Sequence, residues 1–217
     1  PTSSRRQRQM CIRDRSMSEV PEGVDLSGFV RKPPRPTATM TLTRDGPNGP
    51  EVLLGLRSET MAAFPGYWAF TGGGVSRVDG AAVESFSVLD VEHGKFIACI
   101  LRETCEELGV APNGDHLISI DENARFDVIK DKANWLPHAE DCNIPVNVDN
   151  INILGHRITP PFGPVQFDNA FIHFHCGDWQ SVPEIDLEPQ TEFDDIMWSR
   201  PQDILERWSK HEIRVAP

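Results

Sequence analysis

The stretch RETCEELGV, at positions 102–110, decides the fold because it places three glutamates close together on one predicted helix. At about 100° per residue, Glu103, Glu106 and Glu107 fall within an arc of roughly 100°. Apolar residues between positions 97 and 108 recur at three- and four-residue spacing on the opposite side. The pattern predicts an amphipathic helix that begins near Lys95 and stops at Gly109.

The charge on this helix needs an explanation. Glu103 faces Glu106 and Glu107 at i+3 and i+4, and each like-charge contact costs a few tenths of a kcal/mol on an exposed helix. Arg102 can relieve Glu106 at i+4, but it cannot neutralise all three glutamates. One interpretation is a solvated acidic face. The other is a site for Mg²⁺ or Mn²⁺, because these ions require hard oxygen ligands grouped on a rigid element.

The segments before the helix predict strands. Two β-type runs, at 37–44 and 51–57, flank the turn-rich DGPNGP and indicate a hairpin. A short aromatic strand at 67–70 leads directly into TGGGV at 71–75. Consecutive glycines fit either a close approach of the backbone to another group or a plain tight turn. Residues 76–94 show no clear period, which indicates a loop insertion.

The segments after the helix alternate between helical and strand patterns. A second helical stretch is expected near 123–136, strands at 151–158 and 165–175, and a final helix in SRPQDILERWSK at 199–210. Mixed strands with helices on the outside predict an α/β (α+β) sandwich. We expect a single domain over residues 35–217.

The N-terminal residues are set apart by composition. Residues 1–34 are expected to be a disordered or artefactual N-terminus with a proline-rich lead-in, since QRQMCIRDR resembles translated sequencing-adapter read-through. The alternative is an organelle transit peptide, because the segment is rich in arginine and poor in acidic residues. The first sixteen residues carry a net charge of +4, so the rest of the chain, with its overall −12, holds −16.

The acidic body excludes some classes of protein. Sequence-independent nucleic-acid binding depends on a basic surface that displaces counterions, so no nucleic-acid partner is expected. The five cysteines form no CxxC pair, which argues against a structural zinc site and a disulfide framework and favours the cytoplasm. No apolar run approaches the roughly 20 residues of a membrane span, so no membrane partner is expected.

The glycines GGGV at 72–75 followed by RETCEELGV resemble the Nudix box of the Nudix hydrolase superfamily. The second half of the box is matched by Arg102, Glu103, Glu106, Glu107 and Gly109. The first half departs from the pattern. Counting back from Arg102 puts the early glutamate of the box at Gly94 and its first glycine at Val88 instead of Gly73. About fifteen extra residues therefore lie inside the box, in the insertion at 76–94, and Glu92 is the nearest carboxylate.

The interrupted box resembles the coenzyme A diphosphatase-like branch of the superfamily. Similar stretches at 35–58, 64–75, 158–174 and 198–217 cover most of the chain from Arg35. The resemblance implies a Nudix-type α/β/α sandwich with a mixed central sheet and a catalytic loop-helix-loop. Similar proteins continue past the equivalent of Pro217, so the domain is expected to be truncated at its C-terminus.

The resemblance also implies the roles of single residues. Glu103, Glu106 and Glu107 would hold Mg²⁺ or Mn²⁺ with the main-chain carbonyl of Gly72, and Arg102 would orient the glutamates. A water activated by metal and a carboxylate would attack one phosphorus of a diphosphate. Glu103 is the first candidate for the base.

Other residues have two interpretations each. Glu192 is the alternative base, because some members of the superfamily draw it from a distant loop. Gly73 and Gly74 are candidates for substrate binding. Arg57 either meets phosphates or is an exposed strand end, and Asp168 either shapes the substrate site or braces a turn.

Three functions follow from these expectations. The first is hydrolysis of the diphosphate linkage in a nucleoside diphosphate derivative, with coenzyme A or an acyl-CoA as the substrate class. The second is an ADP-ribose or dinucleotide diphosphatase with the same chemistry. The third belongs to another class, a non-catalytic Nudix-like nucleotide-binding domain. A homodimer is an open alternative to a monomer.

Overall fold

The computed structural model describes residues 33–82, 91–130, 150–160, 165–190 and 192–216. The side chains of positions 91 and 92, including Glu92, lie outside this description, as do the N-terminal segment 1–32 and residues 83–90 of the expected insertion. The predicted helical stretch at 123–136 is described only as far as Lys130.

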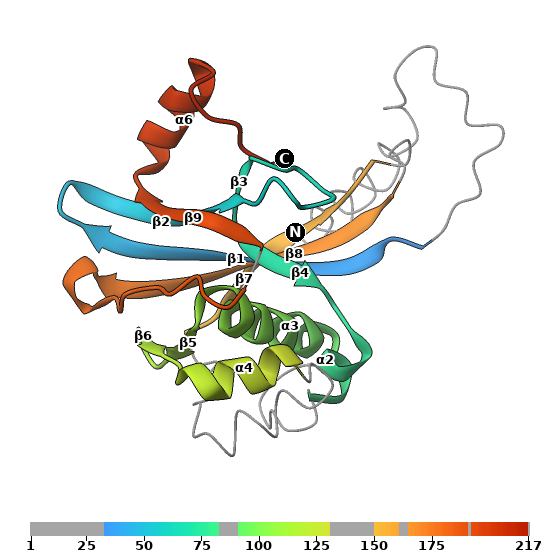
Figure 1. Cartoon of the computed structure of the whole chain (residues 1–217). Coiled ribbons are helices and arrows are strands. Elements are labelled where there is room, and N and C mark those ends of the chain that lie inside the picture. The colour runs from blue at the N-terminus through green and yellow to red at the C-terminus, as the bar shows by residue number, and fades with distance from the viewer. Residues whose placement is uncertain (1–32, 83–90, 131–149, 161–164, 191, 217) are drawn as a thin grey trace, which may run out of the picture.

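The described residues form a seven-stranded mixed sheet around one long central strand (Figure 1). Its main path runs in the order β3, β2, β1, β8 and β7, while β4 also pairs with β1 and β9 with β2. The strands are β1 (Arg35–Gly46), β2 (Gly49–Arg57), β3 (Trp68–Ala69), β4 (Thr71–Gly74), β7 (Asn152–Ile158), β8 (Phe167–Asp178) and β9 (Phe193–Ser199). The hairpin of β1 and β2 confirms the first predicted supersecondary unit.

The central strand β1 owes its place to its alternating sequence. Ala38, Met40 and Leu42 are buried, and threonines occupy the positions between them. β-Branched residues favour the extended backbone, and the period of two turns every apolar side chain to the same face. The strand pairs in parallel with β8 over Arg35 to Asp45, so β1 has neighbours on both sides.

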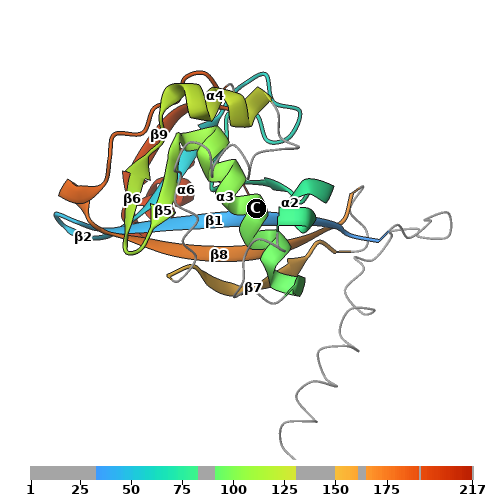
Figure 2. The same ribbon diagram turned by 90° about the horizontal axis from the view of Figure 1, so that it is seen from below.

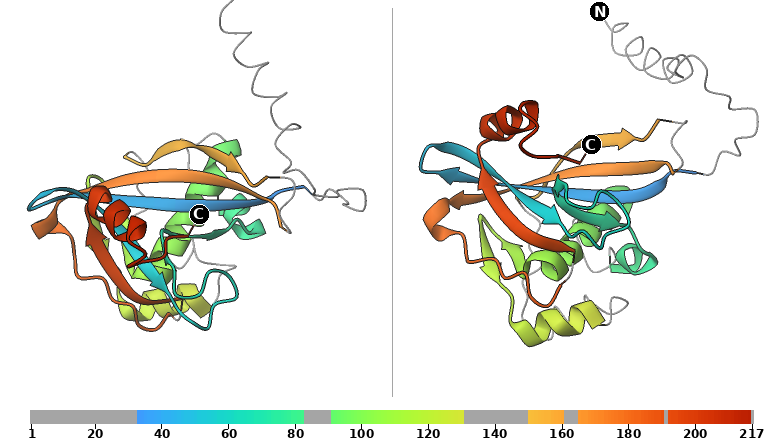
Figure 3. Two further views of the ribbon diagram at one scale, coloured as in Figure 1. Left: turned by 90° about the horizontal axis from the view of Figure 1, so that it is seen from above. Right: turned by 45° about the horizontal axis from the view of Figure 1, so that its top comes forward.

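Helices cover the two faces of the sheet. Helix α3 (Val91–Leu108) packs on one face with α2 (Arg77–Ala82), α4 (Glu122–Lys130) and the small sheet of β5 (Val110–Asn113) and β6 (His116–Ser119) (Figures 1 and 2). Helix α6 (Pro201–Ser209) lies on the opposite face, and Figure 3 shows it beside β2 and β9. This arrangement confirms the predicted α/β sandwich with a mixed sheet.

The structure corrects three expectations about local structure. Helix α3 begins at Val91, before the expected Lys95. Helix α2 lies inside the segment expected to be an aperiodic loop. The glycine stretch is neither a turn nor a loop: Thr71–Gly74 forms strand β4, antiparallel to β1. No helix among the described residues is long and apolar enough to cross a membrane.

Candidate active site

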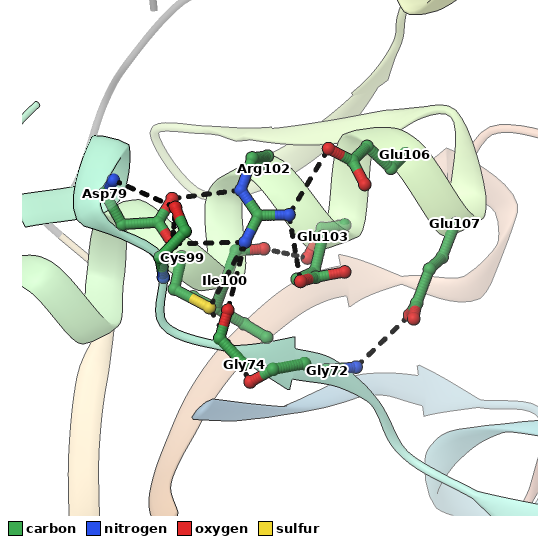
Figure 4. Close-up of polar contacts among 12 residues, drawn as sticks. Gly72, Gly74, Asp79, Cys99, Ile100, Arg102, Glu103, Glu106 and Glu107 are labelled. Carbon is green, nitrogen blue, oxygen red and sulfur yellow. Dashed lines mark hydrogen bonds and ion pairs between the residues drawn. The ribbon is translucent and has the colours of Figure 1, made fainter. Parts of the chain in front are cut away.

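The three glutamates of α3 are buried. Glu103, Glu106 and Glu107 have exposed fractions of 7%, 5% and 2%. The interpretation of a solvated acidic face is therefore wrong. Figure 4 shows these carboxylates in the space between α3, α2 and the glycines of β4. Buried carboxylates are stable only when they are paired, hydrogen-bonded, bound to a metal or protonated.

The glycines let strand β4 lie directly against the carboxylates. A Cβ atom on Gly73 would overlap the carboxylate of Glu103, and one on Gly72 would overlap the backbone carbonyl of Ala38 in β1. The amide nitrogen of Gly72 donates a hydrogen bond to Oε2 of Glu107 at 3.2 Å. Of the two interpretations of the glycine run, the structure confirms a close approach of the backbone.

Arg102 lies between carboxylates from two helices (Figure 4). Its Nη1 atom contacts Oε1 of Glu103 at 2.9 Å and Oε1 of Glu106 at 3.3 Å. Its Nε atom donates to Oδ1 of Asp79 at 2.9 Å, and its Nη2 donates to Oδ2 of the same residue at 3.1 Å. Nη2 also lies 3.3 Å from the carbonyl oxygen of Gly74. Arg102 therefore fixes two of the three glutamates against α2 and β4.

Asp79 is the residue of this site that the sequence interpretation missed. It is fully buried in α2, where Oδ2 also accepts from the amide of Ser76 at 2.7 Å and from its hydroxyl at 3.0 Å. The signal was present, since the early glutamate of the box lies six positions after its first glycine. Six positions after Gly73 is position 79. The expectation failed because it was counted back from Arg102 through the extra residues.

Glu107 lacks a partner for one oxygen. Among the described residues, its Oε1 is a buried side-chain oxygen with no hydrogen-bond partner. Burial raises the pKa of Glu107 well above its ordinary range, and the negative charges of Glu103 and Glu192 raise it further. The hydrogen bond from Gly72 and the charge of Arg57 act in the opposite direction. A divalent cation beside Oε1 would satisfy this oxygen and stabilise the carboxylate.

The glutamates do not form one finished set of metal ligands. Within the described ranges, no group of three or more His, Cys, Asp and Glu side chains has the arrangement of a metal site. The carboxylates of Glu103 and Glu106 both contact Arg102, and those of Glu103 and Glu107 lie beside Gly73 and Gly72 (Figure 4). The donor chemistry fits a hard cation at Glu103 and Glu107, and Glu106 contributes through Arg102 in this conformation.

The structure brings two further predicted residues to this region. Glu192 precedes β9, and its charge acts on Glu107. Arg57, at the end of β2, also acts on Glu107, while its Nε donates to the carbonyl of Ala63 at 2.9 Å. A phosphate contact of Arg57 stays a prediction.

Asp168 has a different environment. It lies on β8 near the end of β7, where its Oδ1 is 3.3 Å from Nδ1 of His156. This contact joins two neighbouring strands, and both expected roles of Asp168, in the substrate site and in bracing a turn, stay predictions.

Comparison with known proteins adds the fold family. A scan against protein-family models finds no matching model, and a search of curated proteins finds no match. The crystal structure of a NUDIX hydrolase from Alicyclobacillus acidocaldarius is 25% identical, covers 86% of this chain and 88% of its own, and has a TM-score of 0.73. The NUDIX domain of Shewanella oneidensis NrtR, solved with ADP ribose, is 14% identical, with coverages of 85% and 82% and a TM-score of 0.47.

The first of these neighbours matches the fold of this chain over most of the length of both proteins. Its overall likeness agrees with the matched half of the box, in which Arg102 and the glutamates occupy the expected helix beside the glycines. The chain has the Nudix fold, and its likeness to the NUDIX hydrolase from Alicyclobacillus acidocaldarius supports a Nudix hydrolase enzyme.

Proposed function

We propose that the protein is a divalent-metal-dependent hydrolase that cleaves the diphosphate linkage of a nucleoside diphosphate derivative. The observation that carries this proposal is the buried Oε1 of Glu107, which has no partner among the described residues and lies in a site with a second carboxylate, Glu103. Leaving a buried charged oxygen unpaired costs more than an ordinary hydrogen bond, so the carboxylate of Glu107 needs either a proton or a cation, and a cation would also neutralise the neighbouring Glu103.

The residues that would hold Mg²⁺ or Mn²⁺ are Glu103 and Glu107, with the main-chain carbonyl of Gly72 as an additional oxygen. Glu106 would join them or remain with Arg102. When bound, the cation supplies Lewis-acid stabilisation of phosphate charge and lowers the pKa of a coordinated water. The protein itself supplies the buried setting, the glycine strand and the fixed orientation of the glutamates.

Two carboxylates are candidates for the base. Glu103 is ion-paired with Arg102 at 2.9 Å, which holds its carboxylate in place beside Gly73. Glu192 lies in the segment before β9, and the proposal does not use it as a metal ligand. The pH dependence of kcat separates them: Glu192→Gln removes the ascending limb if Glu192 is the base, and preserves it if Glu103 is.

We also propose that Asp79 takes the place of the early glutamate of the box. Its two hydrogen bonds with Arg102 support this assignment, together with its spacing from Gly73. The extra residues of this chain then lie between Asp79 and Arg102, and the spacing from Gly73 to Asp79 matches the pattern of the box.

Coenzyme A or an acyl-CoA is the proposed substrate class, and it rests on the similarity of the interrupted box to the coenzyme A diphosphatase-like branch. The alternative substrates are ADP-ribose and dinucleotides. A non-catalytic nucleotide-binding domain is the alternative of another class, and the retained glutamates and the buried Arg102 favour catalysis over it.

The test is to incubate the purified protein with coenzyme A, ADP-ribose, NADH and a dinucleoside polyphosphate in Mg²⁺ or Mn²⁺ and to identify products by mass. Turnover of coenzyme A to phosphopantetheine and adenosine 3′,5′-bisphosphate would establish the branch. Glu107→Gln should lose activity, whereas Glu206→Gln, an exposed glutamate on α6, should keep it. Absence of turnover with every substrate would reject the enzyme and leave the binding domain.

A further inference from the structure

Arg125 is a buried arginine on α4, outside the motif, with an exposed fraction of 2%. Its guanidinium group donates only to main-chain carbonyls in the contacts that the structure shows. Nε and Nη2 donate to the carbonyl oxygen of Glu106 at 3.2 and 3.0 Å. Nη1 donates to the carbonyl oxygens of Asp186, at 2.8 Å, and of Glu188. Arg125 therefore joins α3 to a segment some sixty residues further along the chain.

The hydrogen bonds from Arg125 to the carbonyl of Glu106 cap the C-terminal end of α3. The last four carbonyls of a helix have no partner within the helix, and Glu106 is in the last turn of α3. Gly109 ends the helix with φ +65°, and a Cβ atom there would lie 2.8 Å from Nη1 of Arg125. Glycine at position 109 therefore both ends the helix and leaves room for the guanidinium group.

The segment that Arg125 holds leads to Glu192. Beyond Glu188, the side chain of Gln190 accepts from the amides of Glu192 and Phe193 and donates to the carbonyl of Phe193 at 3.0 Å. The carbonyl of Glu192 accepts from the amide of Ser58 at 2.9 Å, just after β2. The backbone of Glu192 is thus attached to the sheet directly and to α3 through Arg125.

We propose that Arg125 is a positioning residue that fixes the segment leading to Glu192 against the end of α3, and through that segment the position of Glu192, the alternative base. Without Arg125, the segment that leads to Glu192 would keep its attachment to β2 and the packing of Leu187 on the core, and it would lose the hydrogen bonds that join it to the end of α3. The expected effect of Arg125 on kcat rests on the proposed function. Its expected effect on the hydrogen exchange of the Glu192 segment does not.

The structural part is tested by hydrogen exchange on the full chain. In Arg125→Lys, which keeps the charge and cannot span three carbonyls, the amides of Glu192 and Phe193 should exchange at least about tenfold faster. The amides of β1 should be unchanged. Lys130→Met, an exposed change on the same helix, is the matched control and should alter neither region. Unchanged protection at 192 and 193 in a folded Arg125→Lys would overturn the proposal.

The catalytic part is tested by a double-mutant cycle. Displacing a catalytic group by about an ångström can cost on the order of a hundredfold in rate, so Arg125→Lys should lower kcat by about 10- to 100-fold and change KM less than about twofold. In a Glu192→Gln background, Arg125→Lys should cost less than about twofold more, because the group that it positions is already gone. Fully additive losses would show that Arg125 does not act through Glu192.

The two parts fail differently. If the wild-type protein hydrolyses no diphosphate, the proposed function is rejected, and hydrogen exchange still decides whether Arg125 fixes the segment. If kcat falls equally in Arg125→Lys and in the double variant relative to their parents, Arg125 is a structural residue of α3 and the positioning role is rejected.

Discussion

At the scale of single residues, Glu107 has a testable effect on stability. Its pKa is raised by burial and by neighbouring negative charges. A raised carboxyl pKa favours the protonated folded form, so stability is intact below the ordinary pKa and is lost as pH rises towards the raised value. The loss is about 1.4 kcal/mol for each pH unit in that window.

We therefore expect metal-free Glu107→Gln to be more stable than the wild type at neutral pH and equal to it near pH 4. Urea denaturation at a series of pH values in EDTA measures the difference. Saturating Mg²⁺ or Mn²⁺ should stabilise the wild type and not the variant, by the linkage of binding to folding. A difference that is constant from pH 4 to 8 would contradict the buried, unpaired state of this carboxylate.

Asp79 makes a second prediction. Removing one partner of a buried ion pair leaves an uncompensated charge, so Asp79→Asn should lower the free energy of unfolding by about 3 kcal/mol and reduce kcat. The exposed pair of Arg200 and Asp203 offers a matched control, because Asp203→Asn removes the same type of contact at the surface. Equal losses of stability in the two variants, measured by urea denaturation, would contradict a stabilising buried ion pair between Asp79 and Arg102.

The sequence identifies the glutamates but not the residues that hold them. Glu103, Glu106 and Glu107 could be recognised because they share one helix, where spacing determines the face. Asp79 was missed because an insertion of unknown placement separates it from Arg102. Arg125 had no signal, since its partners are backbone carbonyls, which any residue supplies.

At the scale of elements, the close packing of β4 against α3 and β1 can be tested with its three glycines. A methyl group at Gly72 would meet the backbone of β1, and one at Gly73 would meet the carboxylate of Glu103. Gly74 has open space around its missing Cβ. Forced overpacking typically costs 1 to 3 kcal/mol.

We expect Gly72→Ala to lower the free energy of unfolding by about 2 kcal/mol or more and Gly74→Ala to change it far less. Gly73→Ala should affect activity more than stability, because the flexible carboxylate of Glu103 can move away from the methyl group. Thermal denaturation and kcat, measured together, separate these outcomes. Similar behaviour of all three variants would contradict the packing.

The same strand shows why element prediction was incomplete. Thr71–Gly74 carries no apolar alternation, and only its pairing with β1 makes it a strand. Helix α2 is six residues long, too short for a helical period to emerge, and it is held by the contacts of Asp79. The long elements β1, β8 and α3 were predictable because their apolar residues recur at a regular spacing in the sequence.

At the scale of the whole molecule, the sheet separates two hydrophobic clusters. The larger one lies between the sheet and α3, and the smaller one holds Leu54, Ile204 and Ile213 on the α6 side. Because the site lies on the α3 side, damage to the smaller cluster should reduce stability and spare catalysis.

Ile204→Ala should therefore lower the free energy of unfolding by about 2 to 4 kcal/mol and leave kcat/KM within about twofold at a temperature where the variant is folded. Leu205, exposed on the same helix, is the control, and Leu205→Ala should change neither quantity. A loss of kcat/KM in Ile204→Ala that exceeds its unfolded fraction would show that the two faces are coupled.

The pairing of β1 with β8 sets the order in which this protein can be completed during synthesis. The hydroxyls of Thr37 and Thr39 bond to Asn169, across 132 and 130 residues. The edge of β1 that pairs with β8 therefore stays unpaired during synthesis until β8 has been made. Such long-range pairing slows folding, and an open edge invites other chains. We therefore expect nascent chains that stop before position 165 to require a chaperone.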